Sequence, residues 1–416
     1  MNDFKNTMAS LGITSPGGMW GPSWELSGNS FVRDKSFFLD PEFVKSSCNK
    51  LGVSPETTRD ILGSLQSFSE NLPLQRLAWH LHFLIFEIEY TEDKLSELAE
   101  DSKQWPEIMG GASDMFYALV CLSGTPAITD ICARRSIPRE IFLDTMSVFE
   151  QRLKKGGMNS VMWWVIQFFL GRLFKIGRLQ YHIKHWKQDY HVFRNTENRK
   201  VIALAENNML FRVDGQYDGT DGVSGTGTWA SVYRVENGLI TGNPISPYGF
   251  ALKETVKLPV SQWREIFKKG DPELFFHIPA TGPMDHAACG ESLRQAAAFF
   301  PKHFPEHSFK AFICTSWLLD PQLEKYLPPS SNLVQFQSEF YLLPVPGASD
   351  DGLFGHVFGK RFENIDEIPQ LTSLQKALVK HMKSGGKWRD QGCMFFPEDM
   401  NWGAKVYRTS LNWMQS

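Results

Sequence analysis

The stretch that decides the fold is residues 275–340, which read FFHIPATGPMDHAACGESLRQAAAFFPKHFPEHSFKAFICTSWLLDPQLEKYLPPSSNLVQFQSEF. Its pattern predicts a strand, a helix, a second strand, a short helix and a third strand, in that order. Strands that alternate with short helices imply a crossover connection and two parallel strands. Ligands of such units usually bind beyond the carboxyl ends of the strands. We therefore expect a site near residues 277–281 and 314–317.

Composition excludes several classes of protein. The chain has 416 residues, of which 42% are hydrophobic and 21% charged, and this is typical of a globular protein with two or three domains. A net charge of -3 gives no basic field, which argues against nucleic acid as a partner. The six cysteines have no CxxC spacing, so we expect reduced thiols in a cytoplasmic protein and no zinc site.

No membrane partner is expected either. The N-terminus has no basic region followed by an apolar core, so no signal peptide is predicted. The strongest apolar run, VMWWVIQFFLGRLF at residues 161–174, is too short for a confident membrane span and contains Gln167 and Gly171. We interpret it as a buried element that passes from a helix into a strand.

Two domains are predicted, at residues 1–155 and 156–416. The first reads as a bundle of helices, one of them beginning after Ser54 as its N-cap. After Gly156 and Gly157 the chain acquires strand character, and the Gly- and Asp-rich residues 215–249 predict hairpins and an exposed loop. Four further segments are predicted: a short helix within 258–269, a strand at 273–279, a helix from 373 that Gly385 and Gly386 stop, and a strand at 392–396.

Several of these motifs resemble a bacterial family of acyltransferase-domain proteins. They are HIPATGP (277–283), SLRQAAAFFPKHFP (292–305), CTSWLLDPQLEKYLP (314–328) and SSNLVQFQSEF (330–340), together with KIGRLQY (175–181), TGNPISPYGFA (241–251) and TSLQKALVKHMKSGGKW (372–388). In that family a helical N-terminal domain precedes a GNAT-like (N-acetyltransferase-related) C-terminal domain. The resemblance implies an α+β fold in which helices flank a mixed β-sheet.

The resemblance also implies a chemistry. A GNAT domain holds acyl-CoA between two parallel strands that splay apart, here residues 273–279 and 311–319, and the pantetheine arm pairs with exposed strand backbone. Acetyl-CoA or a longer acyl-CoA would be the co-substrate, a small-molecule amine the acceptor, and no metal would take part. The amine attacks the thioester directly, while a base takes the ammonium proton and an acid protonates the thiolate.

The resemblance makes His277 the candidate base and Tyr326 the candidate acid. His277 lies near its strand end, and imidazole titrates near neutral pH. The alternative is a structural strand histidine. Tyr326 lies in the short helix from which GNAT enzymes commonly supply a tyrosine acid; alternatively it is a half-buried aromatic residue at helical spacing from Leu323.

The candidate cofactor-binding residues follow the two predicted strands: Ile278, Ala280, Thr281, Gly282, Ser316 and Trp317. The general GNAT family binds the pyrophosphate through a glycine-rich turn that feeds a helix N-terminus. This sequence departs from that pattern, with Gly282 followed by Pro283. Asp285 is a predicted N-cap, whose carboxylate would occupy the amide donors that a phosphate needs. Ser316 and Trp317 either line the acyl or amine pocket or fasten the strand to the next helix.

Three other groups have simpler explanations. Cys314, inside the apolar run AFICTSW, is a core residue rather than a nucleophile. Asp214, Asp218 and Asp221 lack the order and closing Glu of an EF-hand, so a surface hairpin is preferred to a calcium loop. His80 and His82 are two residues apart on a helix and so lie on different faces, which argues against a shared metal.

Three functions remain open from the sequence. The first is an acyl-CoA-dependent N-acyltransferase. The second is a binding or sensing module that keeps the GNAT scaffold with a degenerate CoA site, and the altered turn at 281–285 favours it. The third is an O-acyltransferase or hydrolase that uses the same cleft.

Overall fold

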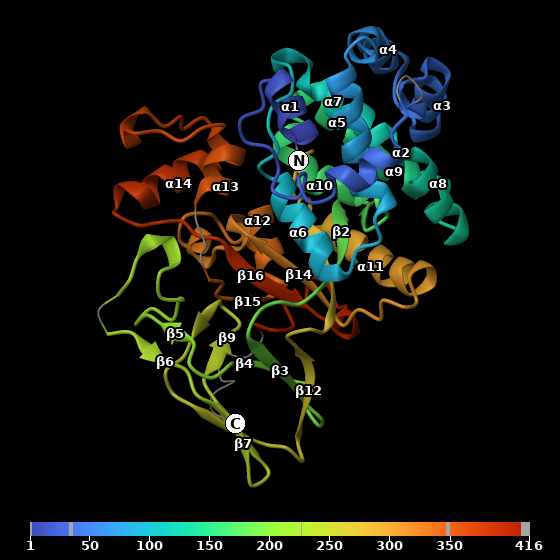
Figure 1. The fold of residues 1–416 in the computed structure, drawn as a ribbon. Coiled ribbons are helices and arrows are strands. Elements are labelled where there is room, and N and C mark those ends of the chain that lie inside the picture. Colours follow the sequence, from blue (N-terminus) through green and yellow to red (C-terminus); the bar gives the residue numbers. More distant parts are fainter. Residues whose placement is uncertain (1, 33–35, 226, 347–349, 409–416) are drawn as a thin grey trace. The chain divides into compact units, whose positions relative to one another are not determined.

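The computed structural model describes residues 2–32, 36–225, 227–346 and 350–408 (Figure 1). The chain forms two compact units, Met1–Ile176 and Gly177–Ser416. The fold class predicted from the sequence is confirmed: helices dominate the first unit, and a mixed sheet with flanking helices makes up the second. The predicted domain boundary between residues 155 and 156 stays a prediction.

The first unit is built from helices that bury their apolar faces against one another. They are α1 (Asn2–Ser10), α2 (Trp24–Ser30), α3 (Pro41–Leu51), α4 (Pro55–Ser69), α5 (Leu72–His82), α6 (Glu92–Ser102), α7 (Ser113–Leu122), α8 (Thr125–Arg134), α9 (Arg139–Lys155) and α10 (Met162–Phe169), followed by the strand β1 (Leu173–Ile176). The predicted N-cap is confirmed, because the Ser54 hydroxyl accepts a hydrogen bond from the Thr57 amide at 3.3 Å. The apolar run at 161–174 is a buried helix followed by a strand, as predicted.

One helical stretch of the described chain, Gly110–Arg134, is long and apolar enough to cross a membrane. It contains α7 and α8, and 67% of its apolar window is buried inside the protein. Length and composition alone are weak evidence, because a buried core helix passes the same test.

The second unit begins with small antiparallel sheets. A five-stranded sheet has the order β10-β9-β4-β3-β12, a three-stranded sheet the order β11-β8-β7, and β5 pairs with β6. The strands are β3 (Tyr190–Asn195), β4 (Val201–Ala205), β5 (Leu210–Phe211), β6 (Trp229–Ala230), β7 (Tyr233–Glu236), β8 (Leu239–Gly242), β9 (Pro244–Ser246), β10 (Phe250–Ala251), β11 (Val256–Pro259) and β12 (Trp263–Lys268). The hairpins predicted at 215–249 are confirmed.

The short helix predicted within residues 258–269 is wrong. Part of this segment forms β12, which pairs antiparallel with β3 and places Phe267 opposite Val192. Both side chains are fully buried. Burial of a ring against a neighbouring strand outweighs the weak helix preference of this short segment.

The larger sheet of the second unit carries the expected pair of parallel strands. Its strands within this unit run in the order β2-β13-β14-β16-β15, with β2 (Leu179–His185), β13 (Pro272–His277), β14 (Ala311–Ser316), β15 (Tyr341–Leu343) and β16 (Gln391–Phe395) (Figure 1). β13 and β14 are parallel, as predicted, and α11 (His286–His303) connects them. All the other pairs among these strands are antiparallel.

The third strand predicted after residue 330 is wrong in its position. Residues 332–338 form α12 (Asn332–Ser338), and the strand β15 begins only at Tyr341. Val334 and Phe336 are buried on this short helix, so the apolar run fits a helix face as well as a strand. The predicted strand at 392–396 is confirmed by β16, which inserts between β14 and β15.

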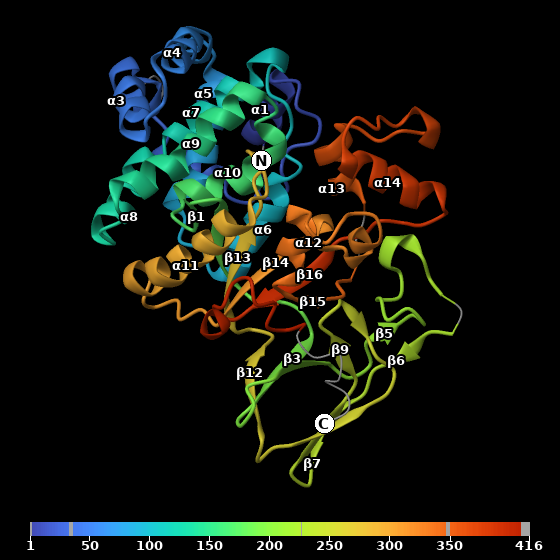
Figure 2. The same ribbon diagram turned by 180° about the vertical axis from the view of Figure 1, so that it is seen from behind.

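The last helices of the second unit lie next to each other in both views (Figure 1, Figure 2). They are α13 (Asp351–Leu353) and α14 (Ser373–Lys383). The glycine stop of α14 is confirmed, since the helix ends at Lys383 and Gly385 has φ 81°.

The N-cap of α11 gives a prediction about stability. The Asp285 carboxylate accepts a hydrogen bond from the Ala288 amide at 2.7 Å, as the sequence predicts. We expect Asp285→Ala to lower the free energy of unfolding by about 1 kcal/mol, because an amide donor loses its acceptor. Asp285→Asn keeps the cap and should lower it much less. Urea unfolding followed by tryptophan fluorescence measures both changes, and equal losses would contradict the capping role.

Candidate functional site

The predicted site lies where β13 and β14 separate. The two strands pair only through Glu273–Ala311, Leu274–Phe312 and Phe275–Ile313. Each then stays with its outer neighbour: β13 pairs with β2 as far as His277, and β14 pairs with β16 as far as Ser316. The splay expected between residues 273–279 and 311–319 therefore begins directly after Phe275 and Ile313.

His277 ends β13 beside two other rings. Its ring lies 5.0 Å from the Phe275 ring and 6.0 Å from the His182 ring, centroid to centroid. Burial, assisted by the positive charge of Lys184, lowers the pKa of His277 to about 3. Nε2 is buried and has no hydrogen-bond partner within the part of the chain that the structure describes. The imidazole is thus neutral and weakly basic, and its role as the base stays a prediction.

The turn after β13 is open, but it is not a bare glycine turn. Ala280, Thr281 and Gly282 are exposed, while Ile278 is half-buried. Gly282 has φ 73°, which favours glycine, and a Cβ at this position would meet no atom within 4 Å. The turn therefore has free space on its outer side, and its predicted role in phosphate binding stays a prediction.

Arg178 brings a positive charge to this turn. Its Nε donates to the Pro283 carbonyl at 2.9 Å, and Nη2 donates to the Gly282 carbonyl at 3.3 Å. Nη1 is buried without a hydrogen-bond partner among the described residues. Sequence reasoning missed Arg178, because it precedes β2, about a hundred residues before the turn.

Ser316 and Trp317 both have structural contacts at the end of β14. The Ser316 hydroxyl accepts from the Leu318 amide at 3.2 Å and so begins a short 3-10 turn, Trp317–Leu319. Trp317 is buried in an apolar cluster with residues of α12 and α14 and with Trp388. Their predicted contact with a cofactor stays a prediction. Cys314 is buried, and burial raises the pKa of its thiol, as expected of a core residue.

Tyr326 packs against the same apolar cluster, to which Trp388 also belongs. Its hydroxyl lies 3.0 Å from Nδ1 of His381, on α14, and Nε2 of His381 lies 3.2 Å from the Lys387 carbonyl oxygen. Sequence reasoning missed His381. The motif SGGKW at residues 384–388 predicts only the end of a helix.

Carboxylates gather beyond β14, on segments far apart in the sequence. Asp320 is fully buried and accepts from the Gln322 amide at 3.0 Å and from the Arg389 amide at 3.2 Å. Burial raises its pKa in spite of these donors and of the Arg389 charge. Burial also raises the pKa of Asp390 to about 6, and the negative charges of Asp320 and Asp350 add to this shift.

Asp221 also interacts electrostatically with Asp320. Burial is the main cause that raises its pKa to about 6, and the Asp320 charge contributes. The calcium interpretation gains no support, because Asp214 pairs with Arg212 at 2.9 Å and Asp218 accepts from the Gly225 amide. In the described ranges, no three His, Cys, Asp or Glu side chains are grouped so that they could hold a metal ion.

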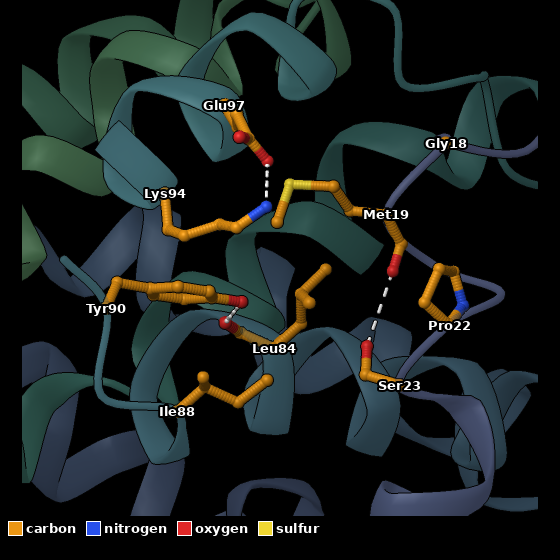
Figure 3. A pocket seen from close by; sticks show the side chains of 9 residues that line it. All are labelled: Gly18, Met19, Pro22, Ser23, Leu84, Ile88, Tyr90, Lys94 and Glu97. Carbon is orange, nitrogen blue, oxygen red and sulfur yellow. Dashed lines mark hydrogen bonds and ion pairs between the residues drawn. The ribbon is translucent and has the colours of Figure 1, made fainter. Parts of the chain in front are cut away.

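Two cavities, each of about 410 Å³, are lined by other parts of the chain. One belongs to the first unit, where Met19, Leu84, Ile88 and Tyr90 surround an open space and the ion pair Lys94–Glu97 lies at its edge (Figure 3). The other belongs to the second unit and is lined by Tyr248, Glu324, Leu327, Pro329, Val334, Ser338, Ala404, Lys405 and Arg408. None of the predicted site residues lines either cavity.

The raised pKa of Asp221 predicts how the contribution of this residue to stability changes with pH. Because the folded state favours its protonated form, its stabilising contribution is present below pH 3.8 and is lost as the pH rises through about 6. We expect Asp221→Asn to raise the free energy of unfolding at pH 7.5 by roughly 1 kcal/mol, since the side chain is half-exposed and solvent screens part of the effect. At pH 4 the gain should nearly vanish.

Asp221→Ala is the control for backbone strain. Asp221 has φ 61°, which Asn tolerates and Ala does not. The alanine variant should therefore gain less than the asparagine variant at pH 7.5. Urea unfolding at both pH values measures these differences, and a gain for Asp221→Asn that is equal at pH 4 and 7.5 would contradict the assignment.

Two solved structures have a fold similar to that of this chain. An acyltransferase in complex with decanoyl-CoA and teicoplanin is 22% identical, with a TM-score of 0.60, over 94% of this chain and 98% of its own. A mutant acyltransferase in complex with octanoyl-CoA is 21% identical, with a TM-score of 0.59 over the same shares. These two likenesses show the fold alone. The sequence has no match among the curated proteins with which it was compared.

The family is shown by the sequence itself. The profile of the GNAT-like C-terminal domain matches residues 173–395, which is more than half of the chain. The resemblance drawn from the motifs of the second unit is thereby confirmed. The chain belongs to the family that carries the GNAT-like C-terminal domain.

Proposed function

We propose that the protein is a cytoplasmic acyl-CoA-dependent N-acyltransferase with a small-molecule amine as acceptor. The observation that carries the proposal is the separation of β13 and β14 after three residue pairs. Backbone groups that face the gap beyond Phe275 and Ile313 are those with which a pantetheine arm would pair. The family match and the acyl-CoA named in both related acyltransferase complexes support this ligand.

The amine acceptor rests on one related complex and on the reaction type of the family. The acyltransferase bound to decanoyl-CoA also holds teicoplanin. In the proposed reaction the amine nitrogen forms a bond to the thioester carbonyl carbon, and the C–S bond then breaks with its electron pair on sulfur. One proton leaves the nitrogen and one reaches the thiolate. His277 and Tyr326 are the proposed base and acid.

Acyl-CoA binding is the first test, and thiol release is the second. The enzyme should show both, whereas a non-catalytic binding module should release no thiol. We expect isothermal titration calorimetry to show binding of octanoyl-CoA or decanoyl-CoA, followed by thiol release when an amine is added. Absence of binding by acetyl-, octanoyl- and decanoyl-CoA would reject the proposal. Binding without thiol release across a panel of amines and alcohols would favour the non-catalytic module.

Arg178 gives a sharper test of where the phosphates bind. Since its guanidinium already lies at the Gly282 and Pro283 carbonyls, we expect Arg178→Gln to weaken acyl-CoA binding about 10-fold through loss of one charge-assisted contact. Acyl-pantetheine, which lacks the pyrophosphate, should bind both proteins equally. Arg294→Gln removes a charge from the exposed face of α11 and is the matched control. An equal loss for acyl-pantetheine would contradict phosphate binding by Arg178.

The His277 and Tyr326 roles are separated by kcat/KM. We expect Tyr326→Phe to lower it by about 100-fold, the usual scale of acid–base catalysis. His277→Ala tests the base: a loss of similar size would support that role, whereas a rate within about threefold of the wild type would remove His277 from the mechanism.

A further inference from the structure

Hydrogen bonds fix the proton positions of the pair Tyr326–His381. The Lys387 carbonyl oxygen can only accept, so Nε2 of His381 carries the proton across the 3.2 Å contact. Nδ1 of the neutral ring is then an acceptor, and the Tyr326 hydroxyl donates to it at 3.0 Å. The lone pairs of the Tyr326 oxygen are consequently left to accept from another donor, and its proton points to His381 rather than to a ligand.

The histidine ring is held in this orientation from several sides. It is buried, and Trp388 packs against it at 4.4 Å between ring centroids. The backbone of Gly386 lies directly on the ring, so that a Cβ at this position would overlap it. The motif Gly385-Gly386 thus has two uses: one glycine ends α14, and the other admits the ring.

A second amide fixes the carbonyl that anchors the ring. Gln322 Nε2 donates to the Lys387 carbonyl at 3.0 Å and to the Asp320 carboxylate at 3.0 Å. The buried Asp320 carboxyl group is therefore linked to the far side of His381 through one amide and one carbonyl.

We propose that Tyr326 and His381 act together as a proton shuttle from the attacking amine to the leaving thiolate. The inference rests on the proposed N-acyltransferase function. It differs from the assignment of His277 as the base, because Tyr326 makes both proton transfers. As the N–C bond forms, the ammonium proton passes to the Tyr326 oxygen while the phenol proton passes to Nδ1 of His381. When the C–S bond breaks, Nδ1 returns its proton to Tyr326, and the phenol gives its proton to the thiolate.

The steps balance without any further reagent. One proton moves from nitrogen to sulfur, and both side chains return to their starting forms. Nε2 keeps its proton throughout and stays bound to the Lys387 carbonyl. In this proposal Tyr326 is the catalytic residue of the pair, because its oxygen exchanges protons with the reacting atoms. His381 is a positioning residue that acts through it.

Several charged groups lie around Tyr326 and His381. Lys380 of α14 lies with Nζ 5.9 Å from the Tyr326 ring, and Asp320 and Arg389 lie beyond the Gln322 amide. Three other charged groups on these elements have partners of their own: Lys387 donates to the Asp221 carbonyl, Lys383 pairs with Asp366, and Glu324 pairs with Arg408. Lys325 and Lys376 are exposed. Among these groups, Asp320 is the one linked to His381, through the Gln322 amide and the Lys387 carbonyl.

The tautomer is measured first, without any substrate. Nitrogen-15 NMR of the full chain, with His381→Asn to identify the signal, should show His381 protonated at Nε2 and bare at Nδ1 at neutral pH. Tyr326→Phe should shift the Nδ1 resonance and leave the Nε2 proton in place. A ring protonated at Nδ1 instead of Nε2 overturns the proposal.

Kinetics then separate a shuttle from a merely structural contact. Asn at position 381 places an acceptor near that of Nδ1 but cannot take a proton, so Tyr326 stays oriented while the relay is lost. We expect His381→Asn and Tyr326→Phe each to lower kcat/KM by about 100-fold, and the double variant to lose no more, because the two residues act as a unit. The limb of the kcat/KM–pH profile that reports His381 should disappear in His381→Asn.

The matched control is His303→Asn, which removes another buried histidine, at the end of α11, and should keep the wild-type pH profile. Turnover with an unchanged profile in His381→Asn overturns the shuttle alone. A wild-type protein that releases no thiol from any acyl-CoA overturns the proposed function, and with it the shuttle.

Discussion

The second unit depends on how far β13 and β14 can stay paired. Their parallel ladder ends after three residue pairs because each strand is bound more extensively on its other side, β13 to β2 and β14 to β16. Antiparallel pairing keeps the outer edges satisfied, so the inner edges diverge without loss of the outer hydrogen bonds. The connections after the two strands then leave the sheet apart from each other. One becomes the turn before α11, and the other becomes the 3-10 turns that carry Tyr326.

A buried carboxylate fixes the geometry of the chain after β14. Asp320 joins the turn Pro321–Lys325 to the segment before β16, since it accepts from both the Gln322 and Arg389 amides. Removal of the carboxylate would leave both amides without this acceptor, at a cost of up to about 1–3 kcal/mol for a donor that water cannot reach. Its raised pKa shows that desolvation outweighs the donors, so the position costs energy that packing elsewhere offsets. In return, Asp320 holds Gln322, whose amide fixes the Lys387 carbonyl beside His381.

The sequence was sufficient for features that depend on local pattern. It predicted the parallel strands, the N-caps Ser54 and Asp285, the glycine stop after α14 and the passage from helix to strand within residues 161–174. It failed where burial decided between helix and strand: Phe267 lies in a strand because Val192 opposes it, and residues 332–338 form a helix. Arg178, Asp320 and His381 were missed because each acquires its partners from distant segments.

The altered phosphate turn is consistent with a CoA site only if the cation comes from elsewhere. In a glycine-rich turn, free amides at a helix N-terminus receive the pyrophosphate. Here the Asp285 carboxylate occupies such an amide and adds a negative charge. Arg178 brings a positive charge to the same turn. Because it donates there to neutral carbonyls, these partners do not cancel its charge. A guanidinium offers paired donors to a phosphate and, unlike backbone amides, a full charge. Salt screens such a contact, so a CoA site of this kind would weaken with ionic strength more than an amide-lined one.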